Sequence, residues 1–197
     1  MKHIIIAGAP RSGKTTLSRI IHTRYCKGQY THYKMDSIKR AVFEYFCPNN
    51  KDWHFASKFV AQIIKKICDD NSQESDAKHP QYFIFDTPHL YPEDVSDFPK
   101  KDFIIVFLGY PNMSVERKTD IILRSDSQSC WTQKLPREEL EKLVRGNIEF
   151  SKEILEQCNK YNLKFFDINQ VMSTSIFKAL KDPVDYIYLQ NNDSGRI

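Results

Sequence analysis

The sequence predicts an α/β protein in which helices cover both faces of a parallel sheet. One observation is that the apolar run HIIIA leads directly into GAPRSGKTT at residues 8–16, with a helical pattern behind it. Another is that about five strand-like segments alternate with helical ones. A length of 197 residues suits one domain. We therefore expect a single domain over residues 1–189 and a flexible polar tail over 190–197.

The first elements are a strand, a helix, a strand and a helix. Residues 2–7 are β-branched and continuously apolar, which is typical of a strand buried on both faces. Apolar residues at helical spacing predict a helix over 14–25. A short strand is expected over 30–35, and a helix over 37–46 that ends before Pro48.

The middle of the chain continues the alternation. Apolar residues at four-residue steps predict a helix over 55–67, followed by a polar loop over 69–79. Strands are expected at 82–85 and 103–108, and a helix at 114–123.

The last third is expected to hold one long helix, one strand and one short helix. Pro136 followed by two glutamates is typical of a helix start, and this helix is expected to continue through Cys158. A strand is predicted over 164–168 and a helix near 173–180.

Composition excludes several classes of protein. The formal charge of +4 comes from basic residues spread along the chain, which does not indicate a nucleic-acid surface. Five cysteines without a CxxC pair suggest neither a disulfide framework nor a zinc site. The same cysteine pattern predicts reduced thiols in a cytoplasmic protein. No apolar run approaches the length that crosses a bilayer, so we expect a soluble protein.

The segment GAPRSGKTT has the pattern GxxxxGK[ST] of a phosphate-binding loop. Glycines let successive backbone N–H groups converge on phosphate oxygens, and the following helix directs its positive end toward them. Lys14 is placed to bridge the β and γ phosphates, and the hydroxyl of Thr15 can bind Mg²⁺. The alternative is a glycine-rich turn with an incidental lysine. The predicted ATP-binding residues are Gly8, Ala9, Pro10, Arg11, Ser12, Gly13, Lys14, Thr15 and Thr16.

Other classes of phosphate-loop protein need motifs that this chain lacks. A GTPase requires DxxG and NKxD, whereas this chain has DTPH at 86–89 and NKYN at 159–162. The LSGGQ-like motif of ABC-type ATPases is absent, and ring-forming ATPases usually have longer chains. A compact kinase or a small ATPase remains.

GAPRSGKTT resembles the phosphate loop of adenylate kinases and of the wider group of small P-loop kinases that act on nucleotides, nucleosides and shikimate-like metabolites. The resemblance implies a five-stranded parallel sheet in the order 2-3-1-4-5, with an acceptor region after the second strand and a lid over the triphosphate. It also implies the activity, an ATP- and Mg²⁺-dependent transfer of the γ-phosphoryl group to a small acceptor such as a nucleoside or nucleotide. We expect a monomer or homodimer.

The acceptor region by this resemblance is MDSIKRAVF at 35–43. Asp36 stands where these kinases commonly carry an acidic residue that orients or deprotonates the acceptor hydroxyl, although it can equally cap the helix. Arg40 resembles the arginine that binds the acceptor's phosphate. If the alignment shifts by one residue, Lys39 takes this role instead of Arg40. The simpler alternative is that Arg40 is a solvated charge on the helix surface.

The segment after the third strand supplies two further candidates. Asp86 can hold Mg²⁺ through water, or can simply form a turn before Pro88. His89 is a candidate acceptor contact, with an exposed loop histidine as the alternative. Adenylate kinases carry an Asp-Gly-aromatic-Pro-Arg segment here, and this chain lacks its glycine and its arginine.

Arg117 and Arg124 follow the fourth strand and are seven residues apart, which places both on one helix face. Lids in this group of kinases deliver arginines to the transferred phosphoryl group, so both are candidate catalytic residues, with a solvated helix face as the alternative. The lid is expected at about 124–136. Two other functions stay open: an ATP-binding switch without a small-molecule acceptor, and a polynucleotide 5′-hydroxyl kinase, which the modest net charge disfavours.

Overall fold

A computed structural model of the chain describes residues 1–24, 30–46, 52–74, 81–88, 90–125, 131–170 and 181–192. Five strands form one parallel sheet in the order β2-β3-β1-β4-β5. This confirms the order that the resemblance implied. The strands are β1 (His3–Gly8), β2 (Tyr30–Lys34), β3 (Tyr82–Asp86), β4 (Phe103–Gly109) and β5 (Lys164–Asp167).

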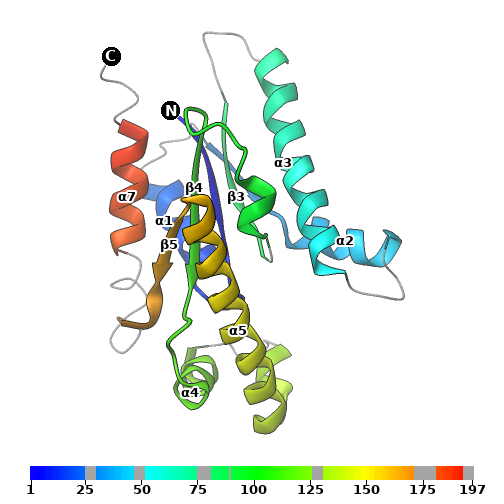
Figure 1. The fold of residues 1–197 in the computed structure, drawn as a ribbon, viewed down its shortest axis with the longest axis vertical. Coiled ribbons are helices and arrows are strands. Elements are labelled where there is room, and N and C mark those ends of the chain that lie inside the picture. The colour runs from blue at the N-terminus through cyan, green and yellow to red at the C-terminus, as the bar shows by residue number, and fades with distance from the viewer. Residues whose placement is uncertain are drawn as a thin grey trace.

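The helices lie in two layers on either side of this sheet. They are α1 (Lys14–Arg24), α2 (Asp36–Phe46), α3 (Trp53–Glu74), α4 (Val115–Ser125), α5 (Arg137–Tyr161) and α7 (Lys181–Asn192). Figure 1 shows α3 and α5 over one face and α1 with α7 toward the other. Short 3-10 helices lie at Pro92–Val95, Trp131–Lys134 and Ile168–Gln170. The predicted three-layer α/β architecture is therefore present.

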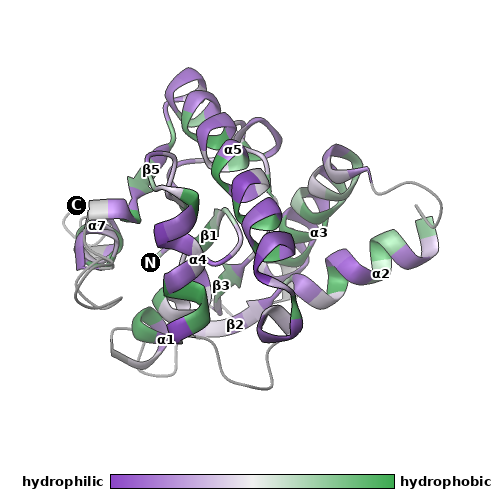
Figure 2. Ribbon diagram, turned by 90° about the horizontal axis from the view of Figure 1, so that it is seen from below, coloured by the Kyte–Doolittle hydropathy of each residue, from purple (hydrophilic) through white to green (hydrophobic). Residues whose placement is uncertain are grey.

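The central strand β1 is buried on both faces because its side chains alternate between two cores. Ile4 and Ile6 belong to the core beneath α1 and α7. Ile5 and Ala7 belong to the core beneath α3 and the second half of α5. Each fully buried aliphatic side chain contributes about 2 kcal/mol by leaving water. Figure 2, viewed from below and coloured by hydropathy, shows α1, α3 and α5 around the strands, with hydrophobic and hydrophilic residues interspersed along each helix.

Register aligns the carboxyl ends of the central strands. Ile4 of β1 lies opposite Ile84 of β3 and Ile104 of β4, and all three strands are parallel. The residues that follow β1, β3 and β4 therefore meet at one edge of the sheet, where ligands bind in open α/β sheets. This edge carries the GAPRSGKTT segment.

Most boundaries agree with the sequence-based expectations within three residues, and the largest differences concern α3 and α7. Helix α3 continues to Glu74, so the polar loop does not begin at residue 69. Helix α7 was not expected, and it includes residues 190–192 of the predicted tail. Its Val184 and Ile187 are buried, which explains why this polar-looking segment packs as a helix. The helix expected near 173–180 lies outside the described residues. None of the described helices has the length and apolar character that a membrane span needs.

Candidate active site

The loop between β1 and α1 has the backbone shape of a phosphate cradle. Gly8, Arg11 and Gly13 all have positive φ, at 121°, 60° and 92°. Such turns direct successive N–H groups to one side and form an anion-binding concavity. A Cβ on Gly8 would lie 2.0 Å from the carbonyl oxygen of Leu108, so only glycine fits there. Helix α1 begins at Lys14 with no acidic residue in its first turn, which leaves its positive end available to an anion.

Lys14 lies buried inside this loop. Its Nζ donates a hydrogen bond to the carbonyl oxygen of Ala9 at 2.7 Å. Burial lowers the pKa of Lys14 to about 8, against the opposing effect of the carboxylates of Asp86 and Asp36. A bound phosphate group would add negative charge beside Lys14 and so stabilise the charged form of this buried amine.

Thr15 and Asp86 meet beside the loop from two different elements. The Thr15 hydroxyl donates to Oδ2 of Asp86 at 2.6 Å, and Asp86 is the buried last residue of β3. Proteins usually hold Mg²⁺ by one or two side chains together with substrate phosphates and water. In the described part of the chain no group of three or more His, Cys, Asp or Glu could hold a metal alone. A hydroxyl beside a carboxylate therefore suits a metal that arrives with a nucleotide.

Two residues behind the loop were not among the sequence-based candidates. Lys118 of α4 is only 1% exposed, and its Nζ donates to the carbonyl oxygen of Arg11 at 2.8 Å. The same ammonium group lies 4.1 Å from the ring centre of Tyr110. The Tyr110 hydroxyl donates to the carbonyl oxygen of Pro10 at 2.5 Å, and burial raises the pKa of this hydroxyl. Both side chains hold loop carbonyl groups outward, which favours N–H groups facing the concavity.

Arg11 connects the loop to the segment expected to form the lid. Its Nη2 donates to Oγ1 of Thr132 at 3.1 Å, and Thr132 is buried in the 3-10 helix Trp131–Lys134. Residues 126–130, the middle of the expected lid, lie outside the described residues. The Ser12 hydroxyl is buried and has no hydrogen-bond partner among the described residues. Buried hydroxyl groups usually have a hydrogen-bond partner, and a ligand bound in the loop would provide one for Ser12.

The acceptor side presents Asp36 and Lys39. Asp36 opens α2, and its carboxylate lies 3.6 Å from Nζ of Lys39. The Lys39 side chain is 14% exposed and that of Asp36 is 58% exposed, so Lys39 lies inward and Asp36 remains accessible. The charge of Asp36 raises the pKa of Lys14 and that of Lys39 lowers it, so both side chains lie on the side of α2 that faces the loop. Arg40 is exposed, so the geometry favours Lys39, its rival in the sequence.

Arg117 and Arg124 are both exposed on α4. Neither guanidinium group forms a hydrogen bond with the part of the chain that the structure describes. Lys118, the next residue after Arg117, faces the loop instead. His89 lies outside the described residues. The sequence did contain a signal for Lys118, because Val115, Lys118 and Ile122 follow the spacing of one helix face.

Comparisons with known proteins concern the fold. No protein-family model matches the sequence, and no curated protein matches it. A shikimate kinase from Acinetobacter baumannii, solved in complex with shikimate, is similar with a TM-score of 0.56 and 15% identity, over 100% of this chain and 96% of that chain. The chain has the fold of small P-loop kinases.

Two further solved structures are similar over nearly their whole length. A protein described as APE1195 has a TM-score of 0.50 and 18% identity, over 98% of this chain and 96% of that chain. A gluconokinase from Sinorhizobium meliloti 1021 has a TM-score of 0.49 and 12% identity, over 96% and 97%. At 15% identity the likeness to the shikimate kinase is one of fold alone, and the chemistry of the site rests on the residues of this chain.

Proposed function

We propose that this protein is an ATP-dependent phosphotransferase that moves the γ-phosphoryl group to a hydroxyl of a small molecule, a nucleoside, nucleotide or related metabolite. The observation that carries the proposal is the meeting of Lys14, Thr15 and Asp86 at the carboxyl edge of the sheet, beside a loop with three positive φ angles. The kinase fold supports it.

In this proposal the nucleotide binds through the loop. The N–H groups of residues 8–16 donate to its phosphate oxygens, and Lys14 moves from the Ala9 carbonyl to a phosphate oxygen. Thr15 and Asp86, which are hydrogen-bonded to each other, would together hold Mg²⁺ beside the phosphates. When bound, Mg²⁺ supplies a positive charge that offsets the charge of the β and γ phosphates.

The transfer step needs a positioned acceptor more than a strong base, because the transition state is loose. The acceptor oxygen forms a bond to the γ-phosphorus while the bond from the γ-phosphorus to the bridging oxygen of ADP breaks. Asp36 accepts the hydroxyl proton. Lys14 stabilises negative charge on the transferred group, and Lys39 contacts an anionic part of the acceptor. The position of Lys39 beside Asp36, with its charge acting on Lys14, supports this role. Catalytic roles for Arg117 and Arg124 require the lid to bring them over the nucleotide.

Label transfer tests this proposal. The protein is incubated with Mg²⁺, γ-labelled ATP and a panel of nucleosides, nucleotides and sugars, and the products are separated. We expect label in at least one acceptor. Slow ATP hydrolysis that no acceptor changes, with no labelled product, would refute the kinase and favour an ATP-binding switch.

A matched pair of variants tests the role of Asp36. Asp36→Asn should lower the transfer rate by about 10²–10⁴-fold, the usual value of a general base. Its affinity for a non-hydrolysable ATP analogue should stay within about twofold. Asp182→Asn removes an exposed carboxylate of α7 and should change neither quantity. Equal losses of rate and affinity in Asp36→Asn would contradict the assigned role.

A further inference from the structure

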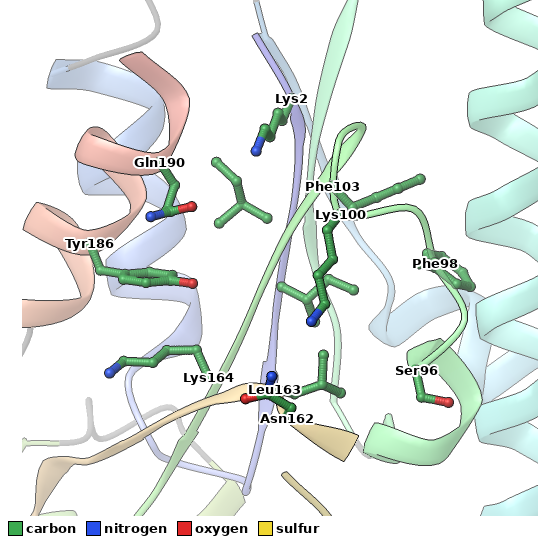
Figure 3. Close-up of a pocket in the computed structure, with 12 residues that line it drawn as sticks. Lys2, Ser96, Phe98, Lys100, Phe103, Asn162, Leu163, Lys164, Tyr186 and Gln190 are labelled. Atoms are coloured by element: carbon green, nitrogen blue, oxygen red, sulfur yellow. The ribbon is translucent and has the colours of Figure 1, made fainter. Parts of the chain in front are cut away.

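A pocket lies at the amino end of β4, on the edge of the sheet opposite the phosphate loop. Its volume is about 120 Å³, enough for several water molecules or one small ligand. Figure 3 shows Tyr186 and Gln190 reaching from α7 toward the strands, with the segment of Ser96 and Lys100 on the other side. We call it the amino-edge pocket. Its lining includes Lys2, Lys100, Phe103, Leu163, Lys164 and Tyr186.

Three lysines from separate elements line the amino-edge pocket. Lys2 precedes β1, Lys100 precedes β4 and Lys164 opens β5. No lining residue is acidic, and among the described residues none of the three ammonium groups takes part in an ion pair. Like charges gathered in a concave site repel one another and concentrate anions from solution.

No acidic side chain lines the amino-edge pocket, although three lie close to it in the sequence. Asp97, Asp102 and Asp185 are adjacent in sequence to lining residues but do not line the cavity. The charge of Asp102 acts on the imidazole of His3. The Nζ of Lys164 lies 5.1 Å from the ring centre of Phe166 and 5.5 Å from that of Tyr186, and both ring faces attract the ammonium group.

The sheet also offers backbone groups to this pocket. Strand β5 begins opposite Val106, so residues 103–105 have no strand partner on that side. The carbonyl groups of Asp102 and Leu108 accept hydrogen bonds from the N–H groups of His3 and Ala9, at either end of β1. The backbone N–H and C=O groups of the even-numbered residues of β4 therefore point toward β1. Because these backbone groups alternate between the two sides of a parallel strand, the N–H and C=O groups of Phe103 and Ile105 point toward the pocket. The N–H of Ile105 therefore points to an edge where β5 is absent.

We propose that the amino-edge pocket binds a small polyanion, a phosphate ester or a polycarboxylate, independently of the phosphate loop. Lys2, Lys100 and Lys164 provide the charge, and the apolar floor of Phe103 and Leu163 accommodates the carbon part of the ligand. The site lies across the sheet from the proposed transfer chemistry, so its ligand is neither the nucleotide nor the acceptor.

Amide-resolved NMR titration of the full chain tests this proposal. Inorganic phosphate and citrate serve as probes and glycerol as a neutral control, with Mg²⁺ and a non-hydrolysable ATP analogue present throughout. We expect saturable shifts at the amides of Ile105 and Leu163 with at least one anion and none with glycerol. Shifts at Gly13 report on the phosphate loop separately, so the two sites are distinguished even if the loop does not bind the ATP analogue.

Two double variants complete the test. Lys100→Gln with Lys164→Gln should weaken anion binding at Ile105 by about tenfold or more. Lys65→Gln with Lys142→Gln removes two exposed lysines from α3 and α5 and should leave it unchanged, although the net charge falls equally. Unfolding curves confirm that both variants fold. Shifts that never saturate, or equal weakening in both variants, would overturn the proposal.

Discussion

Raising the pH should weaken nucleotide binding through Lys14. Burial lowers the pKa of Lys14 to about 8 in the free protein, from 10.5 in an exposed lysine. A bound triphosphate favours the ammonium form and raises this pKa. Affinity is therefore highest below pH 8 and decreases as the pH rises above it. With a pKa of about 8, about nine-tenths of Lys14 is charged at pH 7 and about one-tenth at pH 9, so the association constant should fall about tenfold, or about 1.4 kcal/mol.

Calorimetry measures this effect in two ways. Titration with Mg²⁺ and a non-hydrolysable ATP analogue at pH 7 and pH 9 gives the change in affinity. Titration at pH 8.5 in buffers of different ionisation enthalpy gives the protons taken up, expected at about 0.8 per site. Lys14→Arg keeps its charge over this range and should abolish the pH dependence. Lys65→Met, at an exposed position of α3, should retain it. Equal affinity at pH 7 and pH 9 in the native protein, without proton uptake, would refute the reasoning.

Three further perturbations test the loop. Gly8→Ala should lower the free energy of unfolding by about 3 kcal/mol or more, because the new Cβ would overlap a backbone carbonyl group. Gly146→Ala, which has open space around it in α5, should raise the free energy of unfolding by up to about 1 kcal/mol. Urea unfolding measures both values. Lys118→Met should lower the free energy of unfolding by about 1–3 kcal/mol and weaken binding of the ATP analogue, because a loop carbonyl group loses its donor. Lys142→Met, at an exposed position of α5, should lower it by about 0.5 kcal/mol or less and leave binding unchanged; equal effects of the two variants would contradict the role of Lys118. Thr15→Val should abolish the enhancement of analogue binding by Mg²⁺, seen by calorimetry with and without the metal, and a retained enhancement would exclude Thr15 as a ligand.

The sequence predicted the three central strands well because strands buried on both faces are continuous apolar runs, as in β1, β3 and β4. All five strand positions and the helix after the loop agree with the structure within two residues. Strand order came from the resemblance to P-loop kinases and not from the pattern itself. Helix α7 was missed because its few buried side chains, such as Val184 and Ile187, are separated by polar residues. Only packing against the sheet makes such a segment helical.

Helix faces decide which cationic side chains of α2 and α4 lie toward the loop. A spacing of seven shows that Arg117 and Arg124 share a face but does not tell which face is buried. The buried residues of α4 include Lys118 and Ile122, and Lys118 therefore points to the loop. In α2, Lys39 shares the face of the buried Val42, whereas Arg40 does not. The contacts of the loop carbonyl groups join residues about 100 positions apart, which no local pattern can show.

A structure of the protein with Mg²⁺ and a non-hydrolysable ATP analogue tests the central claim most directly. The account predicts phosphate oxygens within hydrogen-bond distance of the N–H groups of residues 8–16. It also predicts that Nζ of Lys14 leaves the Ala9 carbonyl for a phosphate, with the metal bound to the Thr15 hydroxyl. A nucleotide bound elsewhere, with Lys14 still on the Ala9 carbonyl, would contradict it.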